Sequence, residues 1–389
     1  MSGISRHYVL AAGGTGGHLI PAFALAVELE RRGHHVALIT DDRGSRLPGK
    51  PHSLVAHVLP AGRIGKNPLH WPKGIGAILE GKRMALRLFD SFKPSAVIGF
   101  GGYPAFPALW AATSAGIPSV IHEQNAVLGR VNRFLAGRVD AIATSYREVE
   151  RLKPQHLDKV HLVGNPVRAE VLALREQPFP AFSEDGLLRV LVTGGSQGAG
   201  VLSQVVPDGL AMLPTSLRNR LQVTQQCRPE DIEAVRDRYA SHDIPAELGT
   251  YFENMAERLA DAHLFIGRAG ASTVAELTAV GRPAILVPLP IATDDHQAFN
   301  TAEICAAGGA RMIRQDRFTA SELAKQIQAI AMNPQTLANA AHGAWNCGYP
   351  NAVGDLADLV EGFGGVPLMD VIRVADTAEA ATAPQGAPA

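Results

Sequence analysis

The stretch YVLAAGGTGGH, residues 8–18, sets the fold of the first half of the chain. Five apolar residues with strand character run into a glycine-rich loop, and an apolar-periodic stretch through Leu25, Val27 and Leu29 follows. This stretch ends at Gly33, and Val36 to Ile39 then form a second apolar strand. The order of strand, glycine loop, helix and strand predicts a βαβ unit with its loop at the carboxyl end of the first strand.

The same order of elements recurs in the second half of the chain. A short apolar strand over Leu187 to Val192 leads into GGSQGA, residues 194–199, and then into a helix over Val201 to Met212. The glycine loops begin at residues 13 and 194, about one domain length apart. The sequence therefore predicts an α/β protein with two doubly wound, Rossmann-like domains that face a central cleft, where ligands bind.

Proline residues and composition mark the expected domain limits. Pro166, in the segment GNPVR at 164–168, stops regular structure after an apolar strand over Val160 to Val163. We therefore expect an amino-terminal domain over residues 1–166 and a carboxy-terminal domain over 167–350, with a further helix in 351–374. Residues 375–389 are mostly Ala, Thr, Pro and Gly, and we expect a disordered tail because they hold no large apolar side chain to bury.

The overall composition excludes several classes of protein. The 36 basic and 37 acidic residues leave a net charge of −1, which provides no field for a polyanion and makes nucleic acid an unexpected main partner. Three widely spaced cysteines, Cys227, Cys305 and Cys347, encode neither a disulfide framework nor a zinc site and fit a reducing cytoplasm. The first residues lack the apolar stretch of a signal peptide, so we expect no export.

The glycine loops favour anion binding over cofactor binding. Backbone amides of GGTGGH, residues 13–18, can approach an anion at a helix N-terminus, with Thr15 as an additional donor, although a loop that only serves packing has the same composition. Neither loop fits the GxGxxG dinucleotide fingerprint. Asp41 or Asp42, after the second strand, keeps a nicotinamide or flavin enzyme open as an alternative.

The segment GRAGASTVAEL, residues 267–277, has two interpretations. Thr273 precedes Glu276 by three residues, the spacing of a helix capping box. Alternatively, the helix N-terminus with Ser272 or Thr273 faces a diphosphate, and Glu276 accepts hydrogen bonds from a ribose diol. The position of the helix start decides between the two.

Two further polar segments raise the question of a metal. HEQN, residues 122–125, and DDHQ, residues 294–297, each place carboxylates beside a histidine. Neighbouring residues on a strand or helix point apart, and the sequence has no HExxH or DxD motif. Polar loops that line a sugar pocket fit these segments better, and we expect no metal and no cofactor requirement.

A basic amphipathic segment runs from Trp71 to Phe92. It carries apolar residues at helical spacing beside four cations: Ile75, Ile78, Leu79, Leu86 and Phe89 with Lys73, Lys82, Arg83 and Arg87. Such a stripe packs on a core in most proteins. It can also rest on an anionic membrane surface, which is the second interpretation.

Taken together and in this order, seven motifs closely resemble the MurG family, the bacterial N-acetylglucosaminyltransferases that act on undecaprenyl-diphosphate-muramyl-pentapeptide: GGTGGH, GFGGYP, HEQN, GNPVR, GGSQGA, RAGASTVAE and DDHQ, within residues 13–297. The resemblance implies a GT-B fold, UDP-N-acetylglucosamine as donor and lipid I as acceptor. It also implies lipid II as product, inversion at the anomeric carbon and a peripheral location on the cytoplasmic face of the inner membrane. The helix after Asn351 would cross back to the first domain.

The resemblance also implies roles for single residues. His18 is the expected catalytic base and lies beside the acceptor diphosphate, and Tyr103 is expected on the acceptor side. An imidazole titrates near neutral pH, which suits a base, although His18 as a ligand of the diphosphate stays open. The expected donor-side residues are Thr15, Gly16, Gly17, Asn125, Arg168, Ser196, Phe252, Ala271, Ser272, Thr273, Val274, Ala275, Glu276 and Gln297.

Three alternatives remain at this point. A related GT-B glycosyltransferase with a soluble acceptor would not need the basic amphipathic segment. A dinucleotide-dependent oxidoreductase would carry a nicotinamide or flavin. A sugar-nucleotide binding module without catalysis would bind UDP but release none from the sugar nucleotide.

Overall fold

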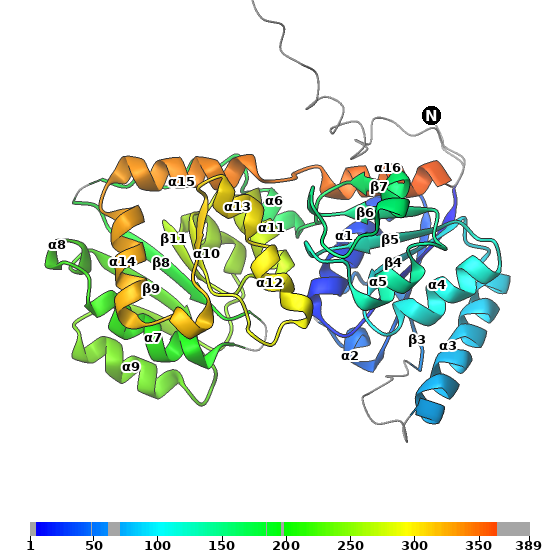
Figure 1. The fold of residues 1–389 in the computed structure, drawn as a ribbon, viewed down its shortest axis with the longest axis horizontal. Coiled ribbons are helices and arrows are strands. Elements are labelled where there is room, and N and C mark those ends of the chain that lie inside the picture. The colour runs from blue at the N-terminus through cyan, green and yellow to red at the C-terminus, as the bar shows by residue number, and fades with distance from the viewer. Residues whose placement is uncertain (1–4, 48, 61–70, 184, 196–197, 364–389) are drawn as a thin grey trace, which may run out of the picture. The chain divides into compact units, whose positions relative to one another are not determined.

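The computed structural model describes residues 5–47, 49–60, 71–183, 185–195 and 198–363. The chain divides into two compact units, coloured along the sequence in Figure 1. One comprises Met1–Pro166 together with the segment from Asn351, and the other comprises Val167–Pro350. The division falls within the segment GNPVR, where the sequence predicts the domain boundary.

The first unit is built on a parallel sheet of seven described strands in the order β3-β2-β1-β4-β5-β6-β7. The strand order reverses between β1 and β4, which creates a switch point at their carboxyl ends. The strands are β1 (His7–Ala12), β2 (His35–Thr40), β3 (Val55–Val58), β4 (Ala96–Gly101), β5 (Ser119–Glu123), β6 (Ala141–Thr144) and β7 (Val160–Leu162).

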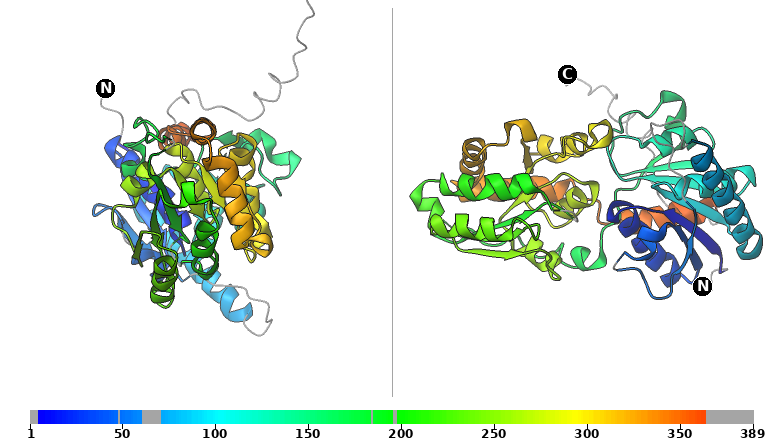
Figure 2. Two further views of the ribbon diagram at one scale, coloured as in Figure 1. Left: turned by 90° about the vertical axis from the view of Figure 1, so that its left-hand side faces the viewer. Right: turned by 90° about the horizontal axis from the view of Figure 1, so that it is seen from below.

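Helices cover both faces of this sheet (Figures 1 and 2). Alternate residues of β1 explain why: Tyr8 and Leu10 pack into the core on one face, and Val9 and Ala11 pack into a separate core on the other. The first core includes α1 (Gly16–Arg31) and α16 (Ala352–Phe363), and the second includes α3 (Trp71–Phe92), α4 (Ala105–Ser114) and α5 (Arg130–Leu135). The unit also contains α2 (Asp42–Ser45) and the 3-10 helix η2 (Pro154–Lys159).

The second unit repeats the same topology. Its described parallel strands follow the order β10-β9-β8-β11-β12-β13, with the switch point between β8 and β11. They are β8 (Leu188–Thr193), β9 (Leu221–Gln226), β10 (Ala246–Gly249), β11 (Leu264–Gly267), β12 (Ala284–Leu286) and β13 (Ala310–Met312). The prediction of two doubly wound α/β domains is confirmed.

Helices again pack on both faces of the sheet. One core includes residues of α7 (Gly200–Ala211), α9 (Ile232–Ser241) and α14 (Ala320–Ala331). The opposite core includes α6 (Ala169–Leu172), α10 (Met255–Asp261) and α11 (Ala271–Ala279). The remaining elements are α8 (Thr215–Arg218), η3 (Thr293–Asp295), α12 (His296–Phe299), α13 (Ala302–Ala306), η4 (Gln315–Arg317) and α15 (Pro334–Asn346).

The helix α16 belongs to the first unit, although it follows the second in sequence. Leu356 and Val360 are fully buried in the same core as α1. Arg32, just after α1, donates to Glu28 at 2.7 Å and to Glu361 of α16 at 2.6 Å. Residues 364–389, which include the expected tail, lie outside the described residues.

Candidate active site

Two glycine-rich loops of the first unit, GGTGGH at residues 13–18 and GFGGYP at residues 99–104, meet at the switch point of the first sheet. The loop after β1 leads into α1, and the loop after β4 leads into α4. A Cβ atom on Gly102 would lie 2.5 Å from the carbonyl oxygen of Gly13, and one on Gly13 would lie 2.5 Å from Pro104. Glycine is required at both positions, because a Cβ on Gly102 would meet the backbone of Gly13 and one on Gly13 would meet the ring of Pro104. Ligands of doubly wound folds bind at this place.

His18 lies in the first turn of α1, which starts at Gly16. Thr15 is the N-cap residue but makes no capping hydrogen bond through its side chain. Nδ1 of His18 lies 3.0 Å from Oε1 of Gln124, and a Cβ atom on Gly101 would approach the His18 ring to 3.0 Å. The structure thus brings together three expected loop residues, Thr15, Gly16 and Gly17, with His18 at a helix N-terminus that attracts anions.

Two buried residues, Gln124 and His122, extend inward from the Nδ1 side of the His18 ring. Gln124 is 1% exposed and His122 is fully buried. Burial lowers the pKa of His122 to about 4, so this side chain is neutral at physiological pH. The sequence analysis assigned HEQN to a polar loop that lines a sugar pocket, with Asn125 on the donor side, and gave no role to His122 or Gln124. The spacing of two residues between His122 and Gln124 is the signal that indicates a shared direction at the end of a strand.

The carboxylate of Glu123 organises the same loop. It accepts from the backbone and side-chain nitrogens of Asn125, at 3.1 and 3.2 Å, from the backbone nitrogen of Gly129 and from Asn132. These bonds hold Asn125 in place and occupy the carboxylate that a metal would need. Across the described residues, no group of three or more His, Cys, Asp and Glu side chains has the arrangement of a metal site.

The start of α11 decides between the two interpretations of GRAGASTVAEL. The N-cap residue is Gly270, so Thr273 lies inside the helix and the capping-box interpretation is wrong. Oγ of Ser272, in the first turn, is buried without a hydrogen-bond partner in the described protein. A buried hydroxyl at a helix N-terminus can donate to a ligand with acceptor atoms. Ala271 and Val274 are buried, and Val274 packs into the core, so only their backbone can face a ligand.

Glu276 makes a bidentate ion pair with Arg168. Nε and Nη2 of Arg168 lie 2.8 and 3.1 Å from the two carboxylate oxygens, and a further nitrogen lies 3.2 Å from Glu170. Burial disfavours the charge of Arg168, but the hydrogen bonds to Glu276 together with the negative charges of Glu276 and Glu170 outweigh burial and raise the pKa of Arg168. The sequence predicts separate roles for Arg168 and Glu276, whereas in the structure the two side chains form one ion pair of fixed geometry.

The remaining expected residues lie in different settings. Phe252 is 9% exposed, and the guanidinium of Arg258 lies 4.4 Å above its ring. Oε1 of Gln297 accepts from the backbone nitrogen of Leu289 at 3.0 Å, which leaves its amide nitrogen as the group for a ligand.

Tyr103 is 47% exposed in the loop after β4. Ala275 lies in α11, and Ser196 lies outside the described residues.

Sequence reasoning missed a half-buried arginine next to this helix. Arg268 directly follows β11 and donates to the carbonyl oxygens of Val287 and Pro288 at 3.0 and 3.2 Å, and to Gln315 at 2.7 Å. It therefore ties the loop before α11 to the loop after β12. An arginine directly before AGAST is visible in the sequence, but nothing there indicates that its partners are carbonyl oxygens.

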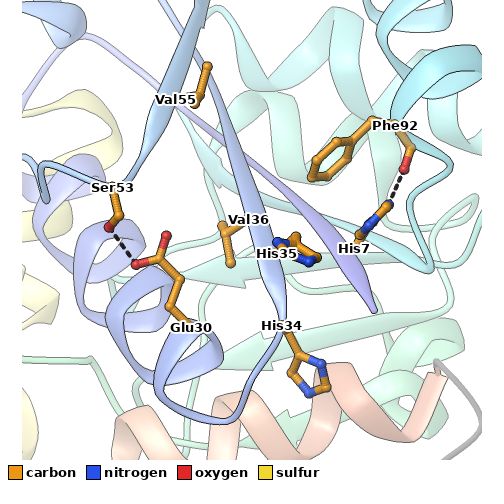
Figure 3. Close-up of a pocket in the computed structure, with 8 residues that line it drawn as sticks. All are labelled: His7, Glu30, His34, His35, Val36, Ser53, Val55 and Phe92. Atoms are coloured by element: carbon orange, nitrogen blue, oxygen red, sulfur yellow. Dashed lines mark hydrogen bonds between the residues drawn. The ribbon is translucent and has the colours of Figure 1, made fainter. Parts of the chain in front are cut away.

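A cavity of about 480 Å³ lies elsewhere in the first unit (Figure 3). His7, His34 and His35 line it with Phe92 and other side chains at the amino ends of β1 and β2, the edge of the sheet opposite to the glycine loops. None of the expected site residues lines it.

Asp41 argues against a dinucleotide site. Its carboxylate caps α2 by accepting from the backbone nitrogen of Gly44 at 2.7 Å, and it also accepts from Gly14 at 3.3 Å. Of the two aspartates that could read a ribose in a dinucleotide enzyme, Asp41 thus holds the glycine loop instead. Two doubly wound domains that each open on a glycine loop are typical of the two-domain GT-B class of glycosyltransferases.

Two family models support that class. The glycosyltransferase family 28 N-terminal domain matches residues 8–144, and the glycosyltransferase family 28 C-terminal domain matches residues 189–357. Enzymes from Erythrobacter litoralis and Novosphingobium aromaticivorans are each 75% identical to the chain, over 96% and 98% of it and 94% and 98% of their own length. Both are named UDP-N-acetylglucosamine--N-acetylmuramyl-(pentapeptide) pyrophosphoryl-undecaprenol N-acetylglucosamine transferase.

A solved structure agrees with these relatives. The crystal structure of MurG from Acinetobacter baumannii is similar with a TM-score of 0.75 and 31% identity, over 92% of this chain and 99% of that one. The chain belongs to the MurG family of N-acetylglucosamine transferases. The resemblance predicted from the seven motifs is confirmed, and a dinucleotide-dependent oxidoreductase is not favoured.

Proposed function

We propose that this chain transfers N-acetylglucosamine from UDP-N-acetylglucosamine to the 4-hydroxyl of the muramyl sugar of lipid I, giving lipid II for peptidoglycan synthesis. The observation that carries this proposal is the near-complete coverage by relatives named for this transfer. A related enzyme with another acceptor is the alternative, and the choice of acceptor separates the two.

The donor-side proposal places UDP on the second unit. The N-terminus of α11 and the unpartnered hydroxyl of Ser272 are suited to the diphosphate, because amide dipoles and a free donor meet there. Glu276, held by Arg168, accepts from the ribose diol with the lone pairs that the ion pair leaves free. The remaining donor-side residues keep their expected roles: Thr15, Gly16, Gly17, Asn125, Ser196, Phe252, Thr273, Ala275 and Gln297.

The chemical step is an in-line displacement. The muramyl 4-oxygen forms a bond to the anomeric carbon while the bond from that carbon to the UDP oxygen breaks, so the configuration inverts. His18 accepts the proton of the hydroxyl, and the electron pair of the broken bond leaves with UDP. Arg168 and the positive end of α11 stabilise the charge that develops on UDP, which makes a divalent metal unnecessary.

We further propose peripheral binding to the cytoplasmic face of the inner membrane. Ile75 and Leu79 of α3 are 47% and 43% exposed, whereas Ile78 and Phe89 of the same helix are buried, so the predicted stripe divides between core and surface. Two exposed side chains of this kind favour membrane contact over packing.

Aromatic and basic side chains of neighbouring helices extend that surface. Lys82 lies 4.2 Å above the ring of Trp110, which stacks on Phe106. Phe106 in turn contacts the 54% exposed Phe134 edge to face, and Arg138 lies 4.7 Å above the Phe134 ring. Aromatic rings flanked by cations are typical of surfaces that meet anionic headgroups. Within the described residues, no helix has the length and apolar character needed to cross a membrane.

Product analysis tests the proposed transfer. The full chain, incubated with UDP-N-acetylglucosamine and a short-chain lipid I analogue, should convert the analogue into a product that is heavier by one N-acetylglucosamine residue, with the new linkage inverted. The matched control is the same analogue without the muramyl 4-hydroxyl, which should stay unchanged. Conversion of this control at an equal rate would place the transfer on another hydroxyl and overturn the proposed acceptor site.

A further inference from the structure

A chain of hydrogen bonds runs from His18 into the interior of the first unit. Nδ1 of His18 lies 3.0 Å from Oε1 of Gln124, and Nε2 of Gln124 lies 2.9 Å from Nδ1 of His122. Nε2 of His122 lies 3.0 Å from the carbonyl oxygen of Gly164. Gln124 and His122 are buried, so water does not compete for these bonds. In each of these hydrogen bonds, the role of one atom as donor or acceptor determines which ring nitrogen of the neighbouring histidine carries a hydrogen.

The orientation of the Gln124 amide is fixed by a group that cannot donate. Nε2 of Gln124 donates to the backbone carbonyl oxygen of His122 at 3.0 Å, and a flipped amide would place two oxygens against each other there. The second N–H of the same amide points to Nδ1 of His122, which must therefore accept. Nε2 of His122 then carries the hydrogen and donates to Gly164.

The opposite end of the amide determines the state of His18. Oε1 of Gln124 can only accept, so Nδ1 of neutral His18 must carry a hydrogen. The lone pair of neutral His18 is then on Nε2, the ring nitrogen that does not face Gln124. We infer that Gln124, oriented by His122, is a positioning residue that holds His18 in the tautomer protonated at Nδ1 and so presents Nε2 as the proton acceptor.

This inference rests on the proposed function of His18 and adds a proton balance to it. The hydroxyl proton of the acceptor moves to Nε2, and His18 becomes an imidazolium whose Nδ1–H still donates to Gln124. The amide takes up no proton. His122 does not accept one either, because burial holds its pKa at about 4. The proton therefore stays on His18 until it is returned to solvent, and no relay through the interior is needed.

The test compares Gln124→Met with the matched variant Gln225→Met. Both glutamines are buried and each side chain accepts a hydrogen bond, since Gln225 accepts from Tyr239 at 2.6 Å in the core of the second unit. Methionine retains the length of the side chain and removes the acceptor. Selective ¹⁵N labelling of the 14 histidines in the full chain, with His18→Gln to identify the His18 signals, reports which ring nitrogen of His18 carries the hydrogen.

We expect His18 to be protonated at Nδ1 in the unmodified protein and in Gln225→Met, and to show a mixture of both tautomers in Gln124→Met. With the lipid I analogue at saturation, the turnover number of Gln124→Met should fall at least about tenfold while UDP binding is unchanged. A merely structural role for Gln124 would lower stability in both variants without moving the His18 signals.

Two results would overturn the inference. One is His18 protonated at Nε2 in the unmodified protein, and the other is a Gln124→Met variant whose His18 remains protonated at Nδ1. Both readouts use the free protein and no substrate. A failure of the proposed transfer is therefore distinguishable from a failure of this inference. In that case no product would form, while His18 would still show the expected tautomers.

Discussion

The buried imidazole of His122 makes the stability of the first unit depend on pH. This side chain has a pKa of about 4 in the folded protein, against about 6.5 in an unfolded chain. Between these values the unfolded chain binds a proton that the folded chain does not bind, so the free energy of unfolding decreases as the pH falls. The contribution of His122 to this decrease is about 2 kcal/mol between pH 7 and pH 5.

Urea unfolding of the unmodified chain and of His122→Phe, each at pH 7 and pH 5, measures this contribution. The variant has lower stability at pH 7 because it loses the bonds to Gln124 and Gly164, but its free energy of unfolding should change less with pH, by about 2 kcal/mol over this range. His52→Ala, at an exposed position, is the control and should retain the pH dependence of the unmodified chain. Glu28 does not interfere, since its bonds to Arg31 hold its pKa at about 2, so that its stabilisation is lost only below about pH 4.5. An equal pH dependence in His122→Phe and the unmodified chain would refute the reasoning.

Three further predictions concern activity and membrane binding. Replacing Ile75 and Leu79 by Ser should weaken flotation with anionic vesicles without lowering the unfolding temperature; unchanged flotation would exclude this surface as the membrane contact. Turnover should persist in the presence of a chelator, and Arg168→Ala should lower it by about a hundredfold because the leaving UDP loses its cation; complete and reversible loss on chelation, with a nearly active Arg168→Ala, would contradict this. His18→Ala should lower the turnover number at least about a hundredfold with donor binding preserved, and recovery of turnover at saturating lipid I analogue would make His18 a binding residue.

The fold could be predicted because its signals are local. A strand followed by glycines and an apolar-periodic helix is visible twice, and the observed strands β1 and β8 start within one residue of the predicted positions. The cores then follow from alternation along each strand, as Tyr8 and Val9 show by packing on opposite faces.

The partners of the site residues could not be predicted, because they depend on contacts between distant segments. Arg168 and Glu276 are 108 residues apart, and His18 and Gln124 are 106 apart, so no spacing indicates that either pair meets. The capping-box interpretation was wrong for a local reason. Gly270 ends the preceding loop with extended backbone, so the helix starts three residues earlier than a cap at Thr273 requires, and Glu276 is left to bind Arg168.

The most direct test of the proposed function is the acceptor dependence of UDP release. At saturating UDP-N-acetylglucosamine, addition of a short-chain lipid I analogue should raise the rate of UDP release by the full chain at least about a hundredfold, in step with the amount of disaccharide product formed. UDP release at the same rate with and without the analogue, or no UDP release in its presence, would contradict the account.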